Sequence, residues 1–322
     1  MIYTPSESMS APSSLAAYSR NPGDSPIAAA ISPMLEMGAY EALWTRPQAS
    51  FKTLAELFQS HPDSVPSDHV ELAVAEHHAM QVLQHFKERQ IDRFGVRVHG
   101  AGEYPVRLRD AQYPVEVLYY RGDWSLADNP RAVAVVGTRN PSEDGIRRAK
   151  KLVRHLVEDG VVIVSGLAKG IDSVAHQTAL EAGGKTIAVI GTPISEVYPK
   201  ENAALQAKLA DEYLVVSQIP VLRYMQQGIQ GNKLFFPERN ITMSALTIGT
   251  VIVEAGETSG TLTQARAALA QGRQLFILES NFRNALLTWP AKYEKRGAVR
   301  VTDYEQVAAH LPHAESTDGD QA

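Results

Sequence analysis

The chain has 322 residues, of which 44% are hydrophobic and 21% charged, and its formal net charge at pH 7 is −5. It can bury a substantial core, but its net charge gives no overall attraction for nucleic acid, so DNA binding would need a local basic surface. The absence of cysteine excludes disulfides, thiolate metal sites and a cysteine nucleophile. No apolar run could span a bilayer and no signal-peptide pattern is evident, so we expect a cytoplasmic protein without membrane contacts.

Composition and periodicity divide the chain into four segments. Residues 1–27 are rich in Ser, Pro and Ala without a regular period, which predicts a flexible arm. Apolar residues recur at helical spacing in 28–92, which predicts a small helical domain whose role the sequence does not assign. In 93–312 strands alternate with helices, and the polar residues 313–322 predict a flexible tail.

The third segment carries the pattern of an α/β protein. Its apolar runs predict strands at 132–136, 161–164, 186–190, 214–216, 250–254 and 274–278. Helical patterns separate several of these runs, which favours right-handed crossovers and a doubly wound, mostly parallel, Rossmann-like sheet. A further edge strand is expected within 297–301 and a last helix within 304–311.

Three of the predicted strands lead into turns rich in glycine and hydroxyl residues. The turns are Gly137-Thr138-Arg139, Ser165-Gly166-Leu167-Ala168-Lys169-Gly170 and Ser259-Gly260-Thr261, and a helical pattern follows each. Glycine lets the backbone approach a ligand, and a helix start offers unpaired N–H groups and the positive end of the helix dipole. Because parallel strands end at one edge of a sheet, the sequence predicts a single crevice that suits phosphate groups.

Five motifs follow one another in a recognisable order. They are Gly137-Thr-Arg139, Ser165-Gly-Leu-Ala-x-Gly-Ile-Asp-x-x-Ala-His176, Tyr198-Pro199, Phe236-Pro-x-Arg-Asn240, and Glu254-Ala followed by Ser259-Gly260. Together they resemble the DNA-processing protein A family, DprA or Smf, over about residues 103–302. The resemblance implies a Rossmann-like domain that binds single-stranded DNA in a basic pocket, forms a homodimer and helps to load RecA during natural transformation. Many members continue into a winged helix, and we expect none within this sequence, because too few residues follow the last predicted helix.

The crevice and the resemblance together define the candidate DNA contacts. Arg139 can grip a phosphate through its planar fork, or else brace a neighbouring loop. Lys169 lies between two glycines and would meet a backbone phosphate, or else be a plain exposed turn residue. We predict that Arg239 contacts the backbone of the DNA strand and that Asn240 either organises a loop or contacts the edge of a base. The glycines and hydroxyls of the three turns, Gly137, Thr138, Ser165, Gly166, Gly170, Ser259, Gly260 and Thr261, complete the set.

Aromatic residues and departures from the family pattern refine this picture. Phe236 could stack on a base, as could Phe235, although core packing is the commoner role of phenylalanine. Ile241 stands where the family motif Arg-Asn-Arg has its last arginine, so one positive charge is missing. Gln218 stands where many relatives have glutamate.

Several other charged residues are expected to be structural. Asp172 and His176 lie one helical turn apart but lack a third ligand, so we predict a capped turn and a packed histidine, with no metal and no cofactor. For Glu254, at a strand end, we predict a structural hydrogen bond. The helix after the first turn carries a basic stripe, which we predict to be exposed to solvent and which consists of Arg147, Lys151 and Arg154.

The same crevice leaves two other functions open. A nucleotide sensor would use these turns for a free phosphate-bearing ligand. The phosphoribohydrolases of the lonely-guy type are similar in fold, and the glutamate of their Gly-Thr-x-x-Glu motif supports hydrolysis of a glycosidic bond. Here the matching position is Gln264, and an amide cannot act as a general base. We therefore expect a protein that is not an enzyme.

Overall fold

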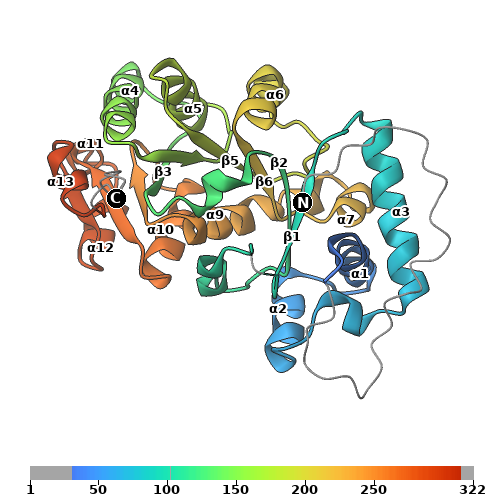
Figure 1. Ribbon diagram of the computed structural model, residues 1–322. Coiled ribbons are helices and arrows are strands. Elements are labelled where there is room, and N and C mark those ends of the chain that lie inside the picture. Colours follow the sequence, from blue (N-terminus) through green and yellow to red (C-terminus); the bar gives the residue numbers. More distant parts are fainter. Residues whose placement is uncertain (1–30, 102, 313–322) are drawn as a thin grey trace, which may run out of the picture.

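A computed structural model describes residues 31–101 and 103–312 of the protein. The predicted arm, 1–27, and the predicted tail, 313–322, lie outside these ranges. Figure 1 shows a central sheet with helices on both of its faces and a separate group of helices at one end. In the described part of the chain no helix is both long and apolar enough to cross a membrane.

The sheet confirms the predicted fold class. Its strands are β1 (Gly95–Val98), β2 (Val117–Gly122), β3 (Ala132–Val136), β4 (Val162–Ser165), β5 (Thr186–Ile190), β6 (Leu214–Ser217), β7 (Gly249–Ile252), β8 (Gln274–Leu278) and β9 (Val299–Val301). They lie in the order β1-β2-β6-β5-β4-β3-β7-β8-β9. All neighbours from β6 to β9 are parallel, whereas β1 and β2 form an antiparallel edge beside β6. The six predicted core strands are thus present to within two residues.

Helices cover both faces of the sheet, as a doubly wound fold requires. One face carries α4 (Glu143–Glu158), α5 (Ile171–Glu181) and α6 (Ala203–Glu212), and the other carries α9 (Phe235–Leu246) and α10 (Thr261–Ala270) (Figure 1). Side chains alternate along β3, so Val133 and Val135 pack with α4 and α5 while Ala134 and Val136 face the other layer. Shorter helices complete the domain: α7 (Val221–Gln226), α8 (Ile229–Asn232), α11 (Glu279–Arg283), α12 (Trp289–Glu294) and α13 (Glu305–Ala308).

The order of the strands creates a switch point. From β3 the chain builds β4, β5 and β6 on one side, then returns to place β7, β8 and β9 on the other side of β3. The loops after β3 and β7 therefore leave the sheet side by side at its carboxyl edge. Ligands of open α/β sheets bind in the crevice at such a point.

The N-terminal helices pack against the antiparallel edge of the sheet. They are α1 (Pro33–Thr45), α2 (Phe51–Ser60) and α3 (Leu72–Glu88), so the predicted boundary at residue 92 falls between α3 and β1. Ser50 caps α2 by accepting the amide of Thr53, whose hydroxyl accepts the amide of Ser50 in return. Buried Tyr40 and Trp44 of α1 belong to the same apolar core as Tyr119 of β2. No gap in the core separates these helices from the sheet.

A buried carboxylate fastens α1 to α7. Glu41 is fully buried and accepts hydrogen bonds from the amides of Val221 at 2.7 Å and Leu222 at 2.9 Å, at the start of α7. The hydroxyl of Tyr119 donates a third bond to it. Burial raises the pKa of Glu41 to about 7. This contact joins the N-terminal helices to the segment that leads into α9.

The last predicted helix is shorter than expected. We predicted a helix within 304–311, and α13 covers Glu305–Ala308. The amides of His310 and Leu311 donate to the carbonyls three residues before them, at 3.0 Å each, so the chain continues as tight turns and not as an α-helix.

Candidate nucleic-acid interface

The three predicted turns meet at the switch point and are joined by their backbones. The amide of Thr138 donates to the carbonyl of Glu254 at 2.7 Å, and the amide of Ile171 donates to the carbonyl of Thr138 at 3.2 Å. Gly170 has a φ of +85°, and a Cβ at this position would lie 2.4 Å from the Thr138 carbonyl oxygen. The hydroxyl of Thr261 donates to the carbonyl of Gly137 at 3.3 Å. The turns therefore form one preorganised edge.

A cleft of about 530 Å³ opens between these turns and α9. Most of the predicted contact residues line it: Gly137, Thr138, Arg139, Phe236, Arg239, Asn240, Ser259, Gly260 and Thr261. A smaller hollow of about 170 Å³ adjoins it, shares Arg139, Phe236 and Arg239, and adds Gly166, Lys169 and Tyr198. The two hollows form a groove along the carboxyl edge of the sheet.

Two cations of this groove, Arg139 and Lys169, have donors available for a ligand. The side chain of Arg139 is exposed, and within the described residues it makes no hydrogen bond or ion pair. Lys169 is 61% exposed, and its Nζ lies 3.8 Å from a carboxylate oxygen of Glu201. An exposed pair at that distance is weak and readily exchanged for another anion. Both cations that the sequence placed in the turns therefore keep donors available for a ligand.

Arg239 is placed differently from its expected position as an open DNA contact. Only 5% of the residue is exposed, and its guanidinium donates to the carbonyl of Gly166 and, at 2.6 Å, to that of Val189. A Cβ on Gly166 would lie 2.4 Å from the guanidinium, so this glycine makes room for the arginine. Burial lowers the pKa of Arg239 to about 10, which still leaves it charged at neutral pH. Arg239 holds the ends of β4 and β5 in register.

Asp172 and His176 have the structural roles that we predicted. Asp172 is buried and accepts the amide of Ala168 at 3.4 Å. Burial raises the pKa of Asp172, and the charge of Arg239 opposes that rise. The Nδ1 atom of His176 lies 2.7 Å from the hydroxyl of Thr186, and burial lowers the pKa of the ring to about 3, so it is neutral. The described residues contain no group of three His, Asp or Glu side chains suited to a metal ion.

Two further predicted residues support the cleft from inside. Ser165 is fully buried, and its hydroxyl donates to the carbonyl of Val135 at 2.7 Å, so it lies beneath the cleft and not in its lining. Asn240 accepts from Nε of Arg239 at 2.8 Å and donates to the carbonyl of Gly260 at 3.2 Å. Asn240 therefore acts on the loop before α10, as one of its two predicted roles requires, and Phe236 to Asn240 lie within α9. The helix is what carries these side chains to the turn before α10.

Comparison with known proteins agrees with this geometry. The sequence matches the family described as DNA recombination-mediator protein A over residues 95–312, which is more than half of the chain. The chain belongs to this family. DNA processing protein DprA of Bacillus subtilis is 32% identical over 232 residues, which cover 72% of this chain and 75% of that protein. DprA of Streptococcus pneumoniae is 38% identical over 208 residues, which cover 65% of this chain and 71% of that protein.

Two solved structures of DprA proteins share the fold. The X-ray structure of DprA from Streptococcus pneumoniae matches with a TM-score of 0.67 at 29% identity, and covers 87% of this chain and 99% of that one. A Helicobacter pylori DprA structure, which concerns the single-stranded DNA binding mode of that protein, matches with a TM-score of 0.58 at 27% identity. It covers 67% of this chain and 94% of that one. The resemblance predicted from the order of the motifs is confirmed.

In this member of the DprA family, two adjacent phenylalanines have opposite environments. Phe235 is buried among Trp44, Phe51 and Tyr224, which is the core packing that we held as the alternative. Phe236 lines both hollows, and its ring centroid lies 5.4 Å from that of Tyr198. Tyr198 is 49% exposed. The sequence motif contains Tyr198, but no local signal marks this residue as a contact, because only the folded chain brings it to Phe236.

The candidate groups for hydrolysis are engaged in structural hydrogen bonds. Glu254 accepts from the amide and hydroxyl of Ser142, at 3.0 and 2.7 Å, and so holds the start of α4 as predicted. Gln264 is buried at the back of the cleft, and its amide nitrogen donates to the hydroxyl of Thr250 at 3.2 Å. Neither residue presents a free carboxylate to a bound ligand.

Proposed function

We propose that this member of the DNA recombination-mediator protein A family binds single-stranded DNA in the groove at the carboxyl edge and has no catalytic step. One observation carries the proposal: Arg139, an exposed arginine without a partner among the described residues, stands beside glycine turns at the switch point of the sheet. A planar guanidinium with free donors is the group best suited to a backbone phosphate. The single-stranded DNA binding of the Helicobacter pylori protein supports the same ligand.

The groove also accounts for a preference for single strands. Phe236 and Tyr198 offer ring surface beside Lys169, so a base can stack where the neighbouring phosphate meets a cation. In a duplex the bases are already stacked and paired, and their faces are not available to protein side chains. We therefore infer that Arg139 and Lys169 contact phosphates and that Phe236 contacts a base, while Arg239 and Asn240 hold the groove open from below.

The family supports further proposals about partners. We propose that the protein acts in the cytoplasm as a homodimer that loads RecA onto single-stranded DNA during recombination or transformation. Two linked grooves on one strand raise the effective concentration of the second contact, which suits a site with few cations. A nucleotide hydrolase is not proposed, because Glu254 is held by Ser142 and because Gln264 is an amide, which cannot act as a general base. The binding experiment below distinguishes a DNA-binding protein from a nucleotide sensor.

The test is fluorescence anisotropy with a labelled thymidine hexamer at low and moderate salt, with duplex DNA and a mononucleotide as competitors. We expect binding that weakens steeply with salt and that the mononucleotide barely displaces. Displacement by a mononucleotide at similar concentration would instead support the sensor.

Arg139→Glu should weaken hexamer binding at least about 100-fold, because a charge-assisted contact is replaced by repulsion. The free energy of unfolding should change by less than about 0.5 kcal/mol, because Arg139 is exposed. Strong binding by the folded variant would contradict the placement of the site.

A further inference from the structure

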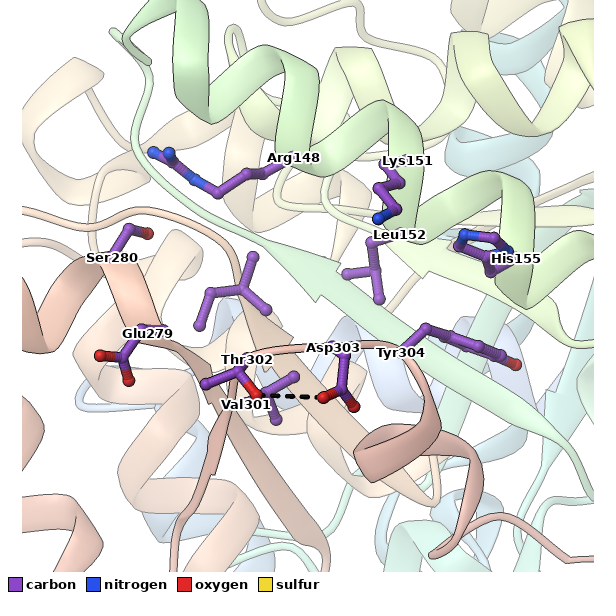
Figure 2. Close-up of a pocket in the computed structure, with 11 residues that line it drawn as sticks. Arg148, Lys151, Leu152, His155, Glu279, Ser280, Val301, Thr302, Asp303 and Tyr304 are labelled. Carbon is purple, nitrogen blue, oxygen red and sulfur yellow. Dashed lines mark hydrogen bonds between the residues drawn. The ribbon is translucent and has the colours of Figure 1, made fainter.

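A third hollow lies at the carboxyl edge, on the α4 side of the sheet. It has a volume of about 110 Å³ and lies between α4 and the segments that follow β8 and β9. Figure 2 shows Lys151 and His155 of α4 on the side of the loop that carries Thr302 and Tyr304, and Arg148 extending toward Ser280. This hollow shares no predicted contact residue with the groove described above.

The hollow combines an apolar floor with a basic wall. Leu152, Leu278 and Val301 form the floor and are buried. The wall is formed by Arg148 and Lys151 of α4, which are three residues apart and lie on one side of the helix. Of the basic stripe, Lys151 lines the hollow. A surface of this kind suits a ligand with a flat apolar part and an attached anion.

Polar atoms in the wall have bonding capacity left over. Nε of Arg148 and the hydroxyl of Ser280 are buried and have no hydrogen-bond partner among the described residues. Lys151 is exposed, and in the same part of the chain it forms no ion pair or hydrogen bond. An unpaired buried donor is costly, so a ligand that accepts from it is favoured.

The two carboxylates at the edge of the hollow are already occupied. Glu279 accepts from Arg300 at 2.7 Å and from Arg283 at 3.1 Å, and these bonds lower its pKa to about 2. Asp303 accepts from the hydroxyl of Thr302 at 3.1 Å and from the amide of Gln306 at 3.2 Å. Both acids are hydrogen-bonded to their own neighbours, whereas Lys151 keeps its donors, so Lys151 is the group of this hollow that can bind an anion.

A chain of contacts joins the hollow to the groove. Nη2 of Arg148 lies 3.4 Å from Glu254, which also accepts the hydroxyl of Ser142 at 2.7 Å. Ser142 caps α4 and follows Arg139 by three residues. Along the helix, Lys151 lies about 14 Å beyond Ser142, which corresponds to about four nucleotides of a stacked strand.

We propose that this hollow binds a further nucleotide of the same DNA strand, with its base on the apolar floor and its phosphate at Lys151. The inference rests on the proposed function, because it extends the strand that begins in the groove at Arg139. It gives part of the basic stripe, which the sequence assigned to solvent, a specific partner. It also predicts that affinity rises with length once a strand reaches past the groove.

The experiment compares anisotropy of a thymidine hexamer with that of a 20-nucleotide thymidine oligomer, for wild type and three variants. Lys151→Glu should weaken binding of the longer oligomer about fivefold to tenfold, by loss of one phosphate and stacking contact. It should weaken the hexamer less, because only one end of the hexamer can reach Lys151 from the groove. Ser280→Phe fills the hollow without changing charge and should produce a similar loss. Arg154→Glu is the matched control, because Arg154 lies on the same helix and is exposed but does not line the hollow.

Equal losses for Lys151→Glu and Arg154→Glu would overturn the proposal, because they would indicate a general field effect. Unchanged binding of the longer oligomer by Ser280→Phe, with the fold intact by circular dichroism, would also overturn it. The hexamer tests the groove separately: if wild type does not bind it in an Arg139-dependent way, the proposed function itself fails.

Discussion

Charged side chains in the groove and at the contact between α1 and α7 differ in their exposure and in their hydrogen-bond partners. In the groove, Arg139 is exposed and has no partner among the described residues. At the α1–α7 contact, Glu41 is fully buried and three donors satisfy it. A charge with spare bonding capacity can serve a ligand, whereas a charge whose capacity is used by the fold serves the fold. Hydrogen-bond partners, more than location, therefore indicate which charged side chains function in binding.

Arg239 is the informative intermediate case. It lines the groove beside Arg139, yet its burial and its two carbonyl partners make it resemble Glu41. If partners decide the role, then Arg239 should behave in experiments as part of the fold, although it lies at the binding site.

The largest expected effect is therefore that of Arg239→Ala on stability. We expect a loss of about 3 to 5 kcal/mol in the free energy of unfolding, because two buried carbonyls lose their donor and Asp172 loses its neighbouring positive charge. Urea unfolding measures this loss. In an Asp172→Asn background the same substitution should cost less, since no buried carboxylate is left without compensation. If Arg239→Ala has wild-type stability but fails to bind DNA, then Arg239 contacts DNA directly, as proposed for Arg139.

Glu41→Gln tests the other side of the comparison through pH. Because burial raises the pKa of Glu41 from 4.5 to about 7, the folded protein holds this proton more tightly than the unfolded chain does. The stabilisation is then complete below pH 4.5 and is lost as the pH rises through 7. The difference in unfolding free energy between wild type and Glu41→Gln should fall by about 3 kcal/mol over this window.

Urea unfolding at a series of pH values measures that difference for Glu41. The Glu41→Gln variant serves as the reference for the wild type, because the remaining titratable groups are common to both proteins. A difference that stays constant with pH would mean that the carboxylate is not held as a buried group. The DNA affinity of the hexamer should change little at pH 8, since Glu41 lies outside the groove.

The smallest effect separates the two phenylalanines. Phe236→Ala should weaken hexamer binding about fivefold to tenfold through loss of base stacking, with little change in stability. Phe235→Ala is the matched control and should instead lower the unfolding free energy by about 3 kcal/mol or more, because a buried ring is removed. Anisotropy and urea unfolding on both variants provide the test. Equal effects of the two substitutions on binding would contradict the assignment of Phe236 to the groove and Phe235 to the core.

Much of the fold could be predicted because it depends on local patterns. Buried parallel strands are short, nearly continuous apolar runs, and glycine turns mark their ends, so six strands and three turns could be placed from the amino-acid order alone. The antiparallel edge formed by β1 and β2 was less visible, since its side chains are buried without a clear alternation. The rule that parallel strands end together was enough to assemble the crevice.

The sequence by itself determined which segments become strands and turns, and which motifs place the chain in its family, because these depend on neighbours in the chain. Only the tertiary structure decided that Arg139 is exposed while Arg239 is buried, that Phe236 faces the groove while Phe235 faces the core, and that Tyr198 joins Phe236. It also joined Glu41 to residues about 180 positions away. Exposure and hydrogen-bond partners depend on chain segments that are distant in sequence, and no local pattern records them.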